Sequence, residues 1–211
     1  MYLARILYPV KVLGPGNRIG IWFDGCPHHC RGCSNPELWD TQEKYKTTLE
    51  VFENLLDKIC STHSVDGFTL TGGDPFAQPE ALEEILPVLS NISNDILVYT
   101  GFQYEELKTL YPKQLSQIGV LIDGPYIEER NIGIPLCGSD NQQIIILNPA
   151  LTETYATYLR DARNTIQDFT TMDGVISVGI HNPDYNTAID KLLQNKGLEH
   201  ISDKENRNER Y

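Results

Sequence analysis

The chain has 211 residues, of which 40% are hydrophobic, and its formal net charge is −12 at pH 7. This length suits one compact domain with a buried core and argues against a second full domain. Nucleic-acid-binding surfaces usually carry clustered Lys and Arg, so the acidic balance argues against nucleic acid as a partner. The N-terminus lacks the apolar stretch of a signal peptide, and no run of about 18 apolar residues could span a membrane. We therefore expect a cytoplasmic protein with no membrane partner.

Two extended segments open the chain, at residues 4–13 and 18–23. Gly14-Pro15-Gly16-Asn17 between them favours a tight reversal. The second segment runs directly into a group of three cysteines. A helix is expected next, with Thr47-Thr-Leu-Glu50 as its capping box. Its apolar face would carry Leu49, Phe52, Leu56, Ile59 and Cys60.

Strands and helices then alternate along the chain. Strands are expected at residues 67–71, 95–99, 119–122 and 143–147. Helices are expected at residues 79–91, 103–111 and 151–165, with Pro87 breaking the first of them late. A hairpin turning at Asp173-Gly174 and a helix over residues 184–195 complete a domain of residues 1–197. The polar segment 198–211 is predicted to be a flexible tail.

Short apolar strands separated by amphipathic helices indicate an α/β fold with a mostly parallel sheet. The chain is shorter than the roughly 250 residues of a complete eight-unit barrel, so we predict an open partial (β/α) barrel of five to six units. In such sheets the active site lies where the strands end. The predicted strands are followed by the cysteine group, Thr71-Gly-Gly-Asp74, Tyr99-Thr-Gly101, Asp123-Gly-Pro125 and Gly179-Ile-His-Asn182.

The cysteine group is a CxxxCxxC motif made of Cys26, Cys30 and Cys33. Three thiolates can ligate three irons of a four-iron cubane and leave the fourth iron open. A cluster with an open iron can bind and reduce a small molecule, whereas a fully ligated cluster mostly transfers electrons. The motif therefore predicts a [4Fe–4S] cluster held by these three cysteines in an enzyme.

A structural zinc site is the alternative interpretation of the same motif, with His28 or His29 as the fourth ligand. Structural zinc sites usually pair one CxxC knuckle with a second ligand pair, and this sequence has no second knuckle. The two other cysteines, Cys60 and Cys137, are isolated. Five cysteines, three of them clustered, fit a reducing compartment and a metal site better than a disulfide framework.

The CxxxCxxC motif followed by Thr71-Gly-Gly-Asp-Pro75 at the end of the next strand resembles the radical SAM superfamily. The resemblance implies that S-adenosylmethionine (SAM) chelates the open iron and is cleaved to a 5′-deoxyadenosyl radical. Because glycines allow a close backbone approach, Thr71, Gly72 and Gly73 could hydrogen-bond the methionine ammonium of SAM. Asp74 would supply negative charge beside it. Without the cysteines, a Gly-Gly-Asp element would be an ordinary turn.

Within this superfamily the sequence is most similar to the activating proteins of anaerobic ribonucleotide reductase. The similar segments are residues 26–40, 99–107, 121–127 and 138–142, and the likeness covers residues 18–147. Gly32, before the last cysteine, also points to this branch. The resemblance implies that the protein generates a glycyl radical on a partner reductase and receives electrons from a flavodoxin or ferredoxin.

The resemblance and the strand ends together suggest further site residues. We expect Asn35 and Trp39 to close over the cluster loop, and Asp123 to meet a hydroxyl, an ammonium or a cation. His181, at the end of Val178-Gly-Ile-His181, is expected near the adenine. The nucleoside would be flanked by Tyr99, Thr100 and Gly101. Ordinary loop packing is the alternative for Trp39, and a simple turn is the alternative for the segment after Asp123.

Three positions depart from the family pattern. Cys137 and Gln143 stand where the activating proteins have arginines, and Ser34 replaces a histidine. Cys137 could be a substrate contact, a metal ligand or, as we favour, a neutral replacement for arginine. An open barrel side would admit a loop of a partner protein, as the activating role needs. The missing arginines support a second function, in which the same cofactor acts on a peptide or small metabolite. A third is a non-catalytic zinc-binding module that recruits a partner.

Overall fold

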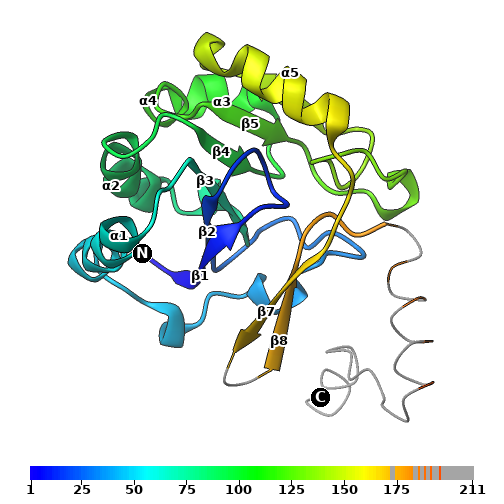
Figure 1. The fold of residues 1–211 in the computed structure, drawn as a ribbon, viewed down its shortest axis with the longest axis horizontal. Coiled ribbons are helices and arrows are strands. Elements are labelled where there is room, and N and C mark those ends of the chain that lie inside the picture. The colour runs from blue at the N-terminus through cyan, green and yellow to red at the C-terminus, as the bar shows by residue number, and fades with distance from the viewer. Residues whose placement is uncertain (172–173, 183–184, 186–187, 189–190, 192–194, 196–211) are drawn as a thin grey trace.

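The computed structural model describes residues 1–171 and 174–182, together with residues 185, 188, 191 and 195. Its centre is a six-stranded sheet in the order β1-β2-β3-β4-β5-β6 (Figure 1). Strands β2 to β5 pair in parallel, and the edge strands β1 and β6 pair antiparallel to their neighbours. In chain order the six strands are Leu3–Val10, Arg18–Phe23, Gly67–Gly72, Ile96–Tyr99, Val120–Asp123 and Gln143–Ile146.

Three helical crossovers connect the parallel strands. They are α1 (Leu49–Thr62), α2 (Pro79–Ser90) and the pair α3 (Tyr104–Leu110) and α4 (Pro112–Leu115). Helix α5 (Thr152–Asp161) follows β6, and a separate hairpin of β7 (Gln167–Thr171) and β8 (Gly174–Val178) comes after it. Figure 1 shows this hairpin beside β1, far from α1 to α4.

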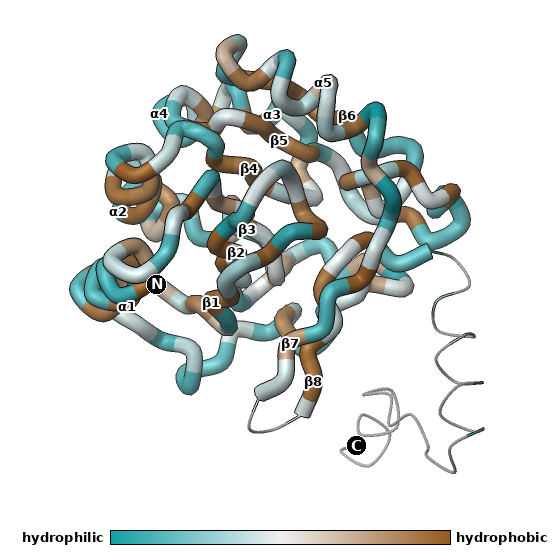
Figure 2. Tube along the Cα trace, viewed as in Figure 1, coloured by the Kyte–Doolittle hydropathy of each residue, from teal (hydrophilic) through white to brown (hydrophobic). Residues whose placement is uncertain are grey.

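Alternate residues of each strand face opposite sides of the sheet. Ile19, Ile21 and Phe23 of β2 belong to the core cluster that also contains Phe52 and Leu56 of α1. The other face of the sheet meets α5 and the β7–β8 hairpin in two smaller clusters. Figure 2 shows hydrophobic residues along β4 and β5 in the middle of the molecule. The apolar strands are therefore covered on both faces, which is typical of parallel sheets.

The predicted α/β class and the mostly parallel sheet are confirmed, whereas a barrel of five to six units is not. The sheet ends at the unpaired edges of β1 and β6, so it is open. Six strands are present, but only β2 to β5 are joined by helical crossovers in the described part of the chain. The edge strands run antiparallel to their neighbours, and antiparallel strands need no helical crossover.

Several element boundaries differ from the sequence prediction. The cap of α1 is Thr48 rather than Thr47, and its hydroxyl accepts a hydrogen bond from the Val51 amide at 3.3 Å. Helix α2 continues through Pro87 to Ser90, because its apolar face is fully buried. Helix α5 ends at Asp161, four residues early, and the short helix α4 was not predicted.

The predicted hairpin near residue 173 is confirmed by the pairing of Thr171 with Gly174. Its turn residues 172–173 lie outside the described residues, as do most of the expected helix over 184–195 and the whole tail 198–211. In the described part of the chain, no helix has both the length and the apolarity needed to cross a membrane.

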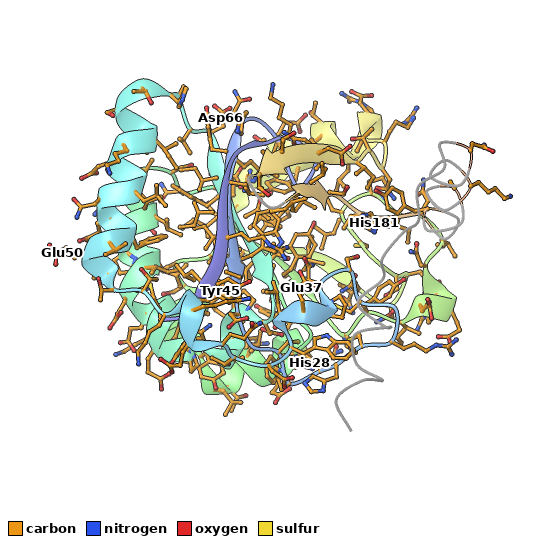
Figure 3. The ribbon with its side chains drawn as sticks, turned by 90° about the horizontal axis from the view of Figure 1, so that it is seen from below. His28, Glu37, Tyr45, Glu50, Asp66 and His181 are labelled. Carbon is orange, nitrogen blue, oxygen red and sulfur yellow. The ribbon has the colours of Figure 1, made fainter. Side chains whose placement is uncertain are left out.

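A buried charge network fixes the amino ends of the strands. Arg18, at the start of β2, is fully buried, and its guanidinium binds the Asp95 carboxylate at 2.8 and 3.0 Å. It also donates to the Thr69 hydroxyl at 2.7 Å, and Tyr155 of α5 donates to Asp95 at 2.7 Å. Figure 3 shows Asp66, just before β3, at the opposite end of the strands from His28. The network therefore ties three strands and α5 together away from the cysteine segment.

Removing the Asp95 carboxylate should destabilise the fold strongly. We expect Asp95→Ala to lower the free energy of unfolding by about 3–5 kcal/mol, because Arg18 would remain buried without its counter-charge. The matched variant Tyr155→Phe loses one hydrogen bond and should cost about 1 kcal/mol. Urea denaturation of both variants measures the difference, and equal effects would contradict this role of the ion pair.

Candidate iron-sulfur site

The three predicted cluster ligands lie on one loop that leaves the carboxyl end of β2. The loop turns sharply because Gly25, His29 and Gly32 have left-handed backbones, with φ values of 94°, 47° and 72°. The Cys26 amide donates to the Trp39 carbonyl at 2.9 Å, which closes the segment into a loop. A short 3-10 helix, Pro36–Leu38, lies within this closure.

All three cysteines are half-buried and free of disulfides. Burial raises the pKa of Cys26 to about 11, and burial also raises the pKa of Cys33. Hydrogen bonds to the sulfur atoms lower both pKa values and so oppose these rises. Two backbone amides of the loop donate to Cys26, and Asn35 and Trp39 donate to Cys33. The Asn35 amide lies 3.4 Å from the Cys33 sulfur. Such donors stabilise a thiolate over a thiol, which is the form that binds iron.

Asp74 connects the cysteine loop to the ends of β3 and β4. Its carboxylate is 1% exposed and accepts hydrogen bonds from the Thr100 hydroxyl at 3.0 Å and the Gly101 amide at 2.8 Å. It also accepts from the Phe76 amide at 2.9 Å, and the His28 Nε2 atom lies 2.9 Å away. The sequence suggested Asp74 as a charge beside a ligand and His28 as a possible ligand in the alternative zinc site. Here both hold the loop in place.

The two glycines before Asp74 allow β3 to pack closely against the same loop. A Cβ atom on Gly73 would lie 2.3 Å from the Gly25 carbonyl oxygen, and one on Gly72 would lie 2.6 Å from the Phe23 carbonyl oxygen. The Gly73 amide donates to Phe23, and the Asp74 amide donates to Gly25. The contact of these glycines with SAM stays a prediction, and the contacts in the structure give them a role in chain packing.

A cavity of about 830 Å³ lies on the inner side of the sheet, next to the cysteine loop. It brings together five of the predicted site residues, namely Cys33, Asn35, Thr71, Tyr99 and His181. Their side chains come from four separate parts of the chain. The cavity is therefore the place where the predicted strand-end residues and the cysteine loop meet.

Other predicted site residues lie away from this cavity lining. Asp123 is 3% exposed, and its carboxylate accepts a hydrogen bond from the Tyr104 amide at 2.9 Å. It thus stabilises the start of α3, where the helix dipole favours negative charge. Thr100 and Gly101 bind Asp74, as described above, and their polar groups point to that carboxylate.

Two polar atoms at the cavity are buried without a hydrogen-bond partner in the described part of the chain, the Tyr99 hydroxyl and His181 Nε2. Burial raises the pKa of Tyr99 and lowers the pKa of His181, which favours the neutral form of both. The His181 ring also stacks on Tyr185, with centroids 4.0 Å apart. Buried polar atoms are normally hydrogen-bonded, so these two can bind polar groups of a ligand.

Sequence reasoning missed several residues that shape the cavity. Arg5 of β1 donates to the Asn35 side chain at 3.0 Å and pairs with Glu37, so it fixes the cysteine loop from a strand. The Gln142 side chain donates to the Gly124 carbonyl at 2.9 Å and orders the segment before β6. A basic residue in an edge strand carries no sequence signal for this role, because its partners lie about 30 residues away.

Among the described residues, no three His, Cys, Asp or Glu side chains form a group that could hold a metal ion. The three thiols share one loop that carries hydrogen-bond donors for their sulfur atoms. A cubane needs one thiolate for each ligated iron rather than three ligands around one ion. This donor set therefore fits the cysteine-ligated cluster predicted from the sequence.

Comparison with known proteins supports that assignment. A family model described as a 4Fe-4S single cluster domain matches residues 12–145. The anaerobic ribonucleoside-triphosphate reductase-activating protein of Enterobacteria phage T4 is 34% identical over 146 residues, which are 65% of this chain and 90% of that protein. The proteins of the same name from Vibrio cholerae serotype O1 and Escherichia coli (strain K12) are 32% and 30% identical over 145 residues. Those matches cover 65% of this chain and 93% and 94% of the two relatives.

The chain belongs to this family of activating proteins. The matched region contains the cysteine loop, Asp74, strands β2 to β5 and β6 up to residue 145, whereas β1 lies before it. The β7–β8 hairpin and His181 lie beyond the family model. One wall of the cavity in this member of the activating-protein family therefore comes from a segment that the family model does not contain.

Cys137, one of the three departures from the family pattern, lies in the core. It is 2% exposed and packs with Leu97, Val120 and Tyr155 in the cluster that joins the sheet to α5. Burial, followed by the nearby charge of Asp123, raises its pKa to about 11, so the thiol is neutral at pH 7. The preferred interpretation as a neutral residue agrees with this. An arginine side chain would not fit at this position, because the site is in the core.

Replacing Gly73 by alanine should disturb the cysteine loop and lower cluster loading. We expect Gly73→Ala to cost about 1–3 kcal/mol of stability, because the added methyl group collides with a backbone carbonyl rather than a movable side chain. Iron and sulfide contents after anaerobic reconstitution measure the effect. Gly174→Ala is the control for backbone strain alone, because its φ is 143° but a Cβ atom there meets nothing within 4 Å, and it should keep normal iron content. Normal iron content in Gly73→Ala would show that the loop does not need this close packing.

Cys137→Arg should destabilise the protein by about 3–5 kcal/mol, because it places a large charged side chain in a packed apolar cluster. Cys137→Ala removes one sulfur atom from the same place and should cost about 1 kcal/mol. Thermal and urea unfolding of the two variants separate the effects. An arginine variant as stable as the alanine variant would place residue 137 at the surface.

Proposed function

We propose that this protein is a radical SAM enzyme that generates a glycyl radical on an anaerobic ribonucleotide reductase. The observation that carries the proposal is the arrangement of three free cysteines on one loop beside a cavity lined by Thr71, Tyr99 and His181. With a [4Fe–4S] cluster and SAM bound, one-electron cleavage of SAM gives methionine and a 5′-deoxyadenosyl radical that takes a hydrogen atom from a glycine.

The residues of the loop have the role of holding and orienting the cluster. Cys26, Cys30 and Cys33 are the proposed thiolate ligands of three irons. Amide and indole hydrogen bonds to the sulfur atoms lower the energy of the thiolates, and such bonds also affect the reduction potential of clusters. His28 and Asp74 keep the loop fixed relative to the strand ends.

The cavity residues have the role of binding SAM and keeping water away. The Tyr99 hydroxyl and the neutral His181 ring can form hydrogen bonds to polar groups of SAM. Asn35 and Thr71 line the same cavity. Gly72, Gly73 and Asp74 support this cavity through the loop contacts. In this proposal, Asp123, Thr100 and Gly101 support the frame of the site rather than touch the reacting atoms.

The proposed partner follows from the names of the relatives, which are reductase-activating proteins. A flavodoxin or ferredoxin is the proposed electron donor, because reductive cleavage needs single electrons of low potential. Five cysteines and an oxygen-sensitive cluster fit a reducing compartment such as the cytoplasm.

A second candidate function keeps the same cofactors but takes a small molecule as substrate. The observation that favours it is the large cavity, which has walls from the loop, the strand ends and the C-terminal segment. A cavity of about 830 Å³ is in the range of small-molecule sites.

Substitution of each motif cysteine tests the proposal. Cys26→Ala, Cys30→Ala and Cys33→Ala should each abolish formation of 5′-deoxyadenosine from SAM in the reduced, reconstituted protein, because a cluster iron loses its ligand. Liquid chromatography of the products measures this. Cys60→Ala is the matched control and should keep both cluster and activity, since Cys60 of α1 packs against the hydrophobic core. Wild-type cleavage by any of the three variants, or loss of the cluster in the control, would overturn the ligand assignment.

A further inference from the structure

The C-terminal part of the described chain crosses the open side of the sheet. We define the C-terminal strap as β7, β8 and residues 179–182, all of which lie beyond the family model. After β6 and α5, at one side of the sheet, the chain returns to β1 at the other side (Figure 1). The strap therefore lies between the two edges that leave the sheet open.

One end of the strap is fastened to β1. The Gln167 side chain donates to the Pro9 carbonyl at 2.7 Å and accepts from the Lys11 amide at 2.9 Å. Val178 of β8 is 3% exposed and packs in the cluster that contains Val10. These contacts use the edge of the sheet that would otherwise be open to solvent.

The other end is fastened to the segment between β5 and β6. The Asn131 side chain donates to the His181 carbonyl at 2.9 Å. Asn164, just before the strap, lies 3.4 Å from the Ile134 carbonyl and donates to it. The strap itself is thus held at both sides of the opening through three side-chain hydrogen bonds and one buried apolar contact, and the Asn164 bond holds the segment that leads into it.

The inner side of the strap forms a wall of the cluster cavity. Its residues 175–182 line the cavity, and Cys33 lies on the lining of the same cavity. The sequence predicted an open side that admits a protein loop, but this side is covered. A polypeptide that approaches the cluster from here meets the strap first.

We propose that the C-terminal strap determines the size of substrate that reaches the cluster. With the strap on β1, small molecules enter the cavity, and a polypeptide segment enters only after the strap leaves β1. The inference rests on the proposed function for the identity of the site, but it concerns access to Cys33 and needs no cluster for its test.

Thiol labelling of the cluster-free protein tests this access. The probes are N-ethylmaleimide and a maleimide linked to polyethylene glycol, and peptide mass spectrometry reports each cysteine. The ratio of large-probe to small-probe rates removes differences in thiol pKa. We expect a ratio at Cys33 about tenfold below that at Cys60 on α1, which lies outside the cavity lining. Equal ratios at the two cysteines would overturn the proposal.

Release of the strap should remove this size selection. Gln167→Ala deletes the hydrogen bonds to Pro9 of β1 and to Lys11 just after it, and should raise the ratio at Cys33 toward that at Cys60. Asp168→Ala is the matched control. Asp168 is next to Gln167, but its carboxylate accepts a hydrogen bond from Ser177 within the hairpin rather than from β1. Asn131→Ala releases the opposite end and provides a second test if Gln167→Ala unfolds. An unchanged ratio in folded Gln167→Ala and Asn131→Ala would show that the strap does not control access.

These outcomes are independent of the proposed radical chemistry. If the labelling shows size selection but SAM is not cleaved, the proposal for the strap holds and the proposed function is wrong. If SAM is cleaved but labelling shows no size selection, the proposed function holds and the proposal for the strap is wrong.

Discussion

The hydrogen bonds of the Asp74 carboxylate place the cysteine loop on the sheet. The shape of the loop depends on left-handed residues that alone would not fix its position. Asp74 joins it through His28 to the end of β4 and to the turn after β3. Because this carboxylate is buried, each donor that is lost removes a hydrogen bond that water does not readily replace. Correct placement of the thiols therefore depends on a residue that the sequence suggested as a ligand contact.

The two ends of the sheet have different physical tasks. The amino ends are held by the fully buried Arg18 with Asp95 and Tyr155, so three strands and α5 are fixed there. The carboxyl ends carry glycines, half-buried thiols and unpartnered polar atoms, which contribute little to stability. A rigid network at one end permits a polar cavity at the other. The same separation is usual in parallel sheets, whose ligands bind beyond the carboxyl ends of the strands.

Much of the fold could be predicted from the sequence because its signals are local. The apolar runs that form β2 to β5 and the reversal at Gly14-Pro15-Gly16-Asn17 were recognised, and so was the cysteine motif. The contacts of Asp74, Asp123 and Cys137 could not be predicted from the sequence, for a common reason. Each is polar or reactive and follows a strand, but its partners come from distant segments. Closure of the open side by the strap was also unpredictable, since Gln167 and Pro9 are 158 residues apart.

Electron paramagnetic resonance gives the most direct test of the activating role. The reconstituted protein is reduced, mixed with SAM and the anaerobic ribonucleotide reductase of the same organism, and frozen under exclusion of oxygen. The account predicts a glycyl-radical signal on the reductase that requires SAM and is absent with Cys33→Ala. Cleavage of SAM by the wild-type protein without any radical on the reductase would contradict it.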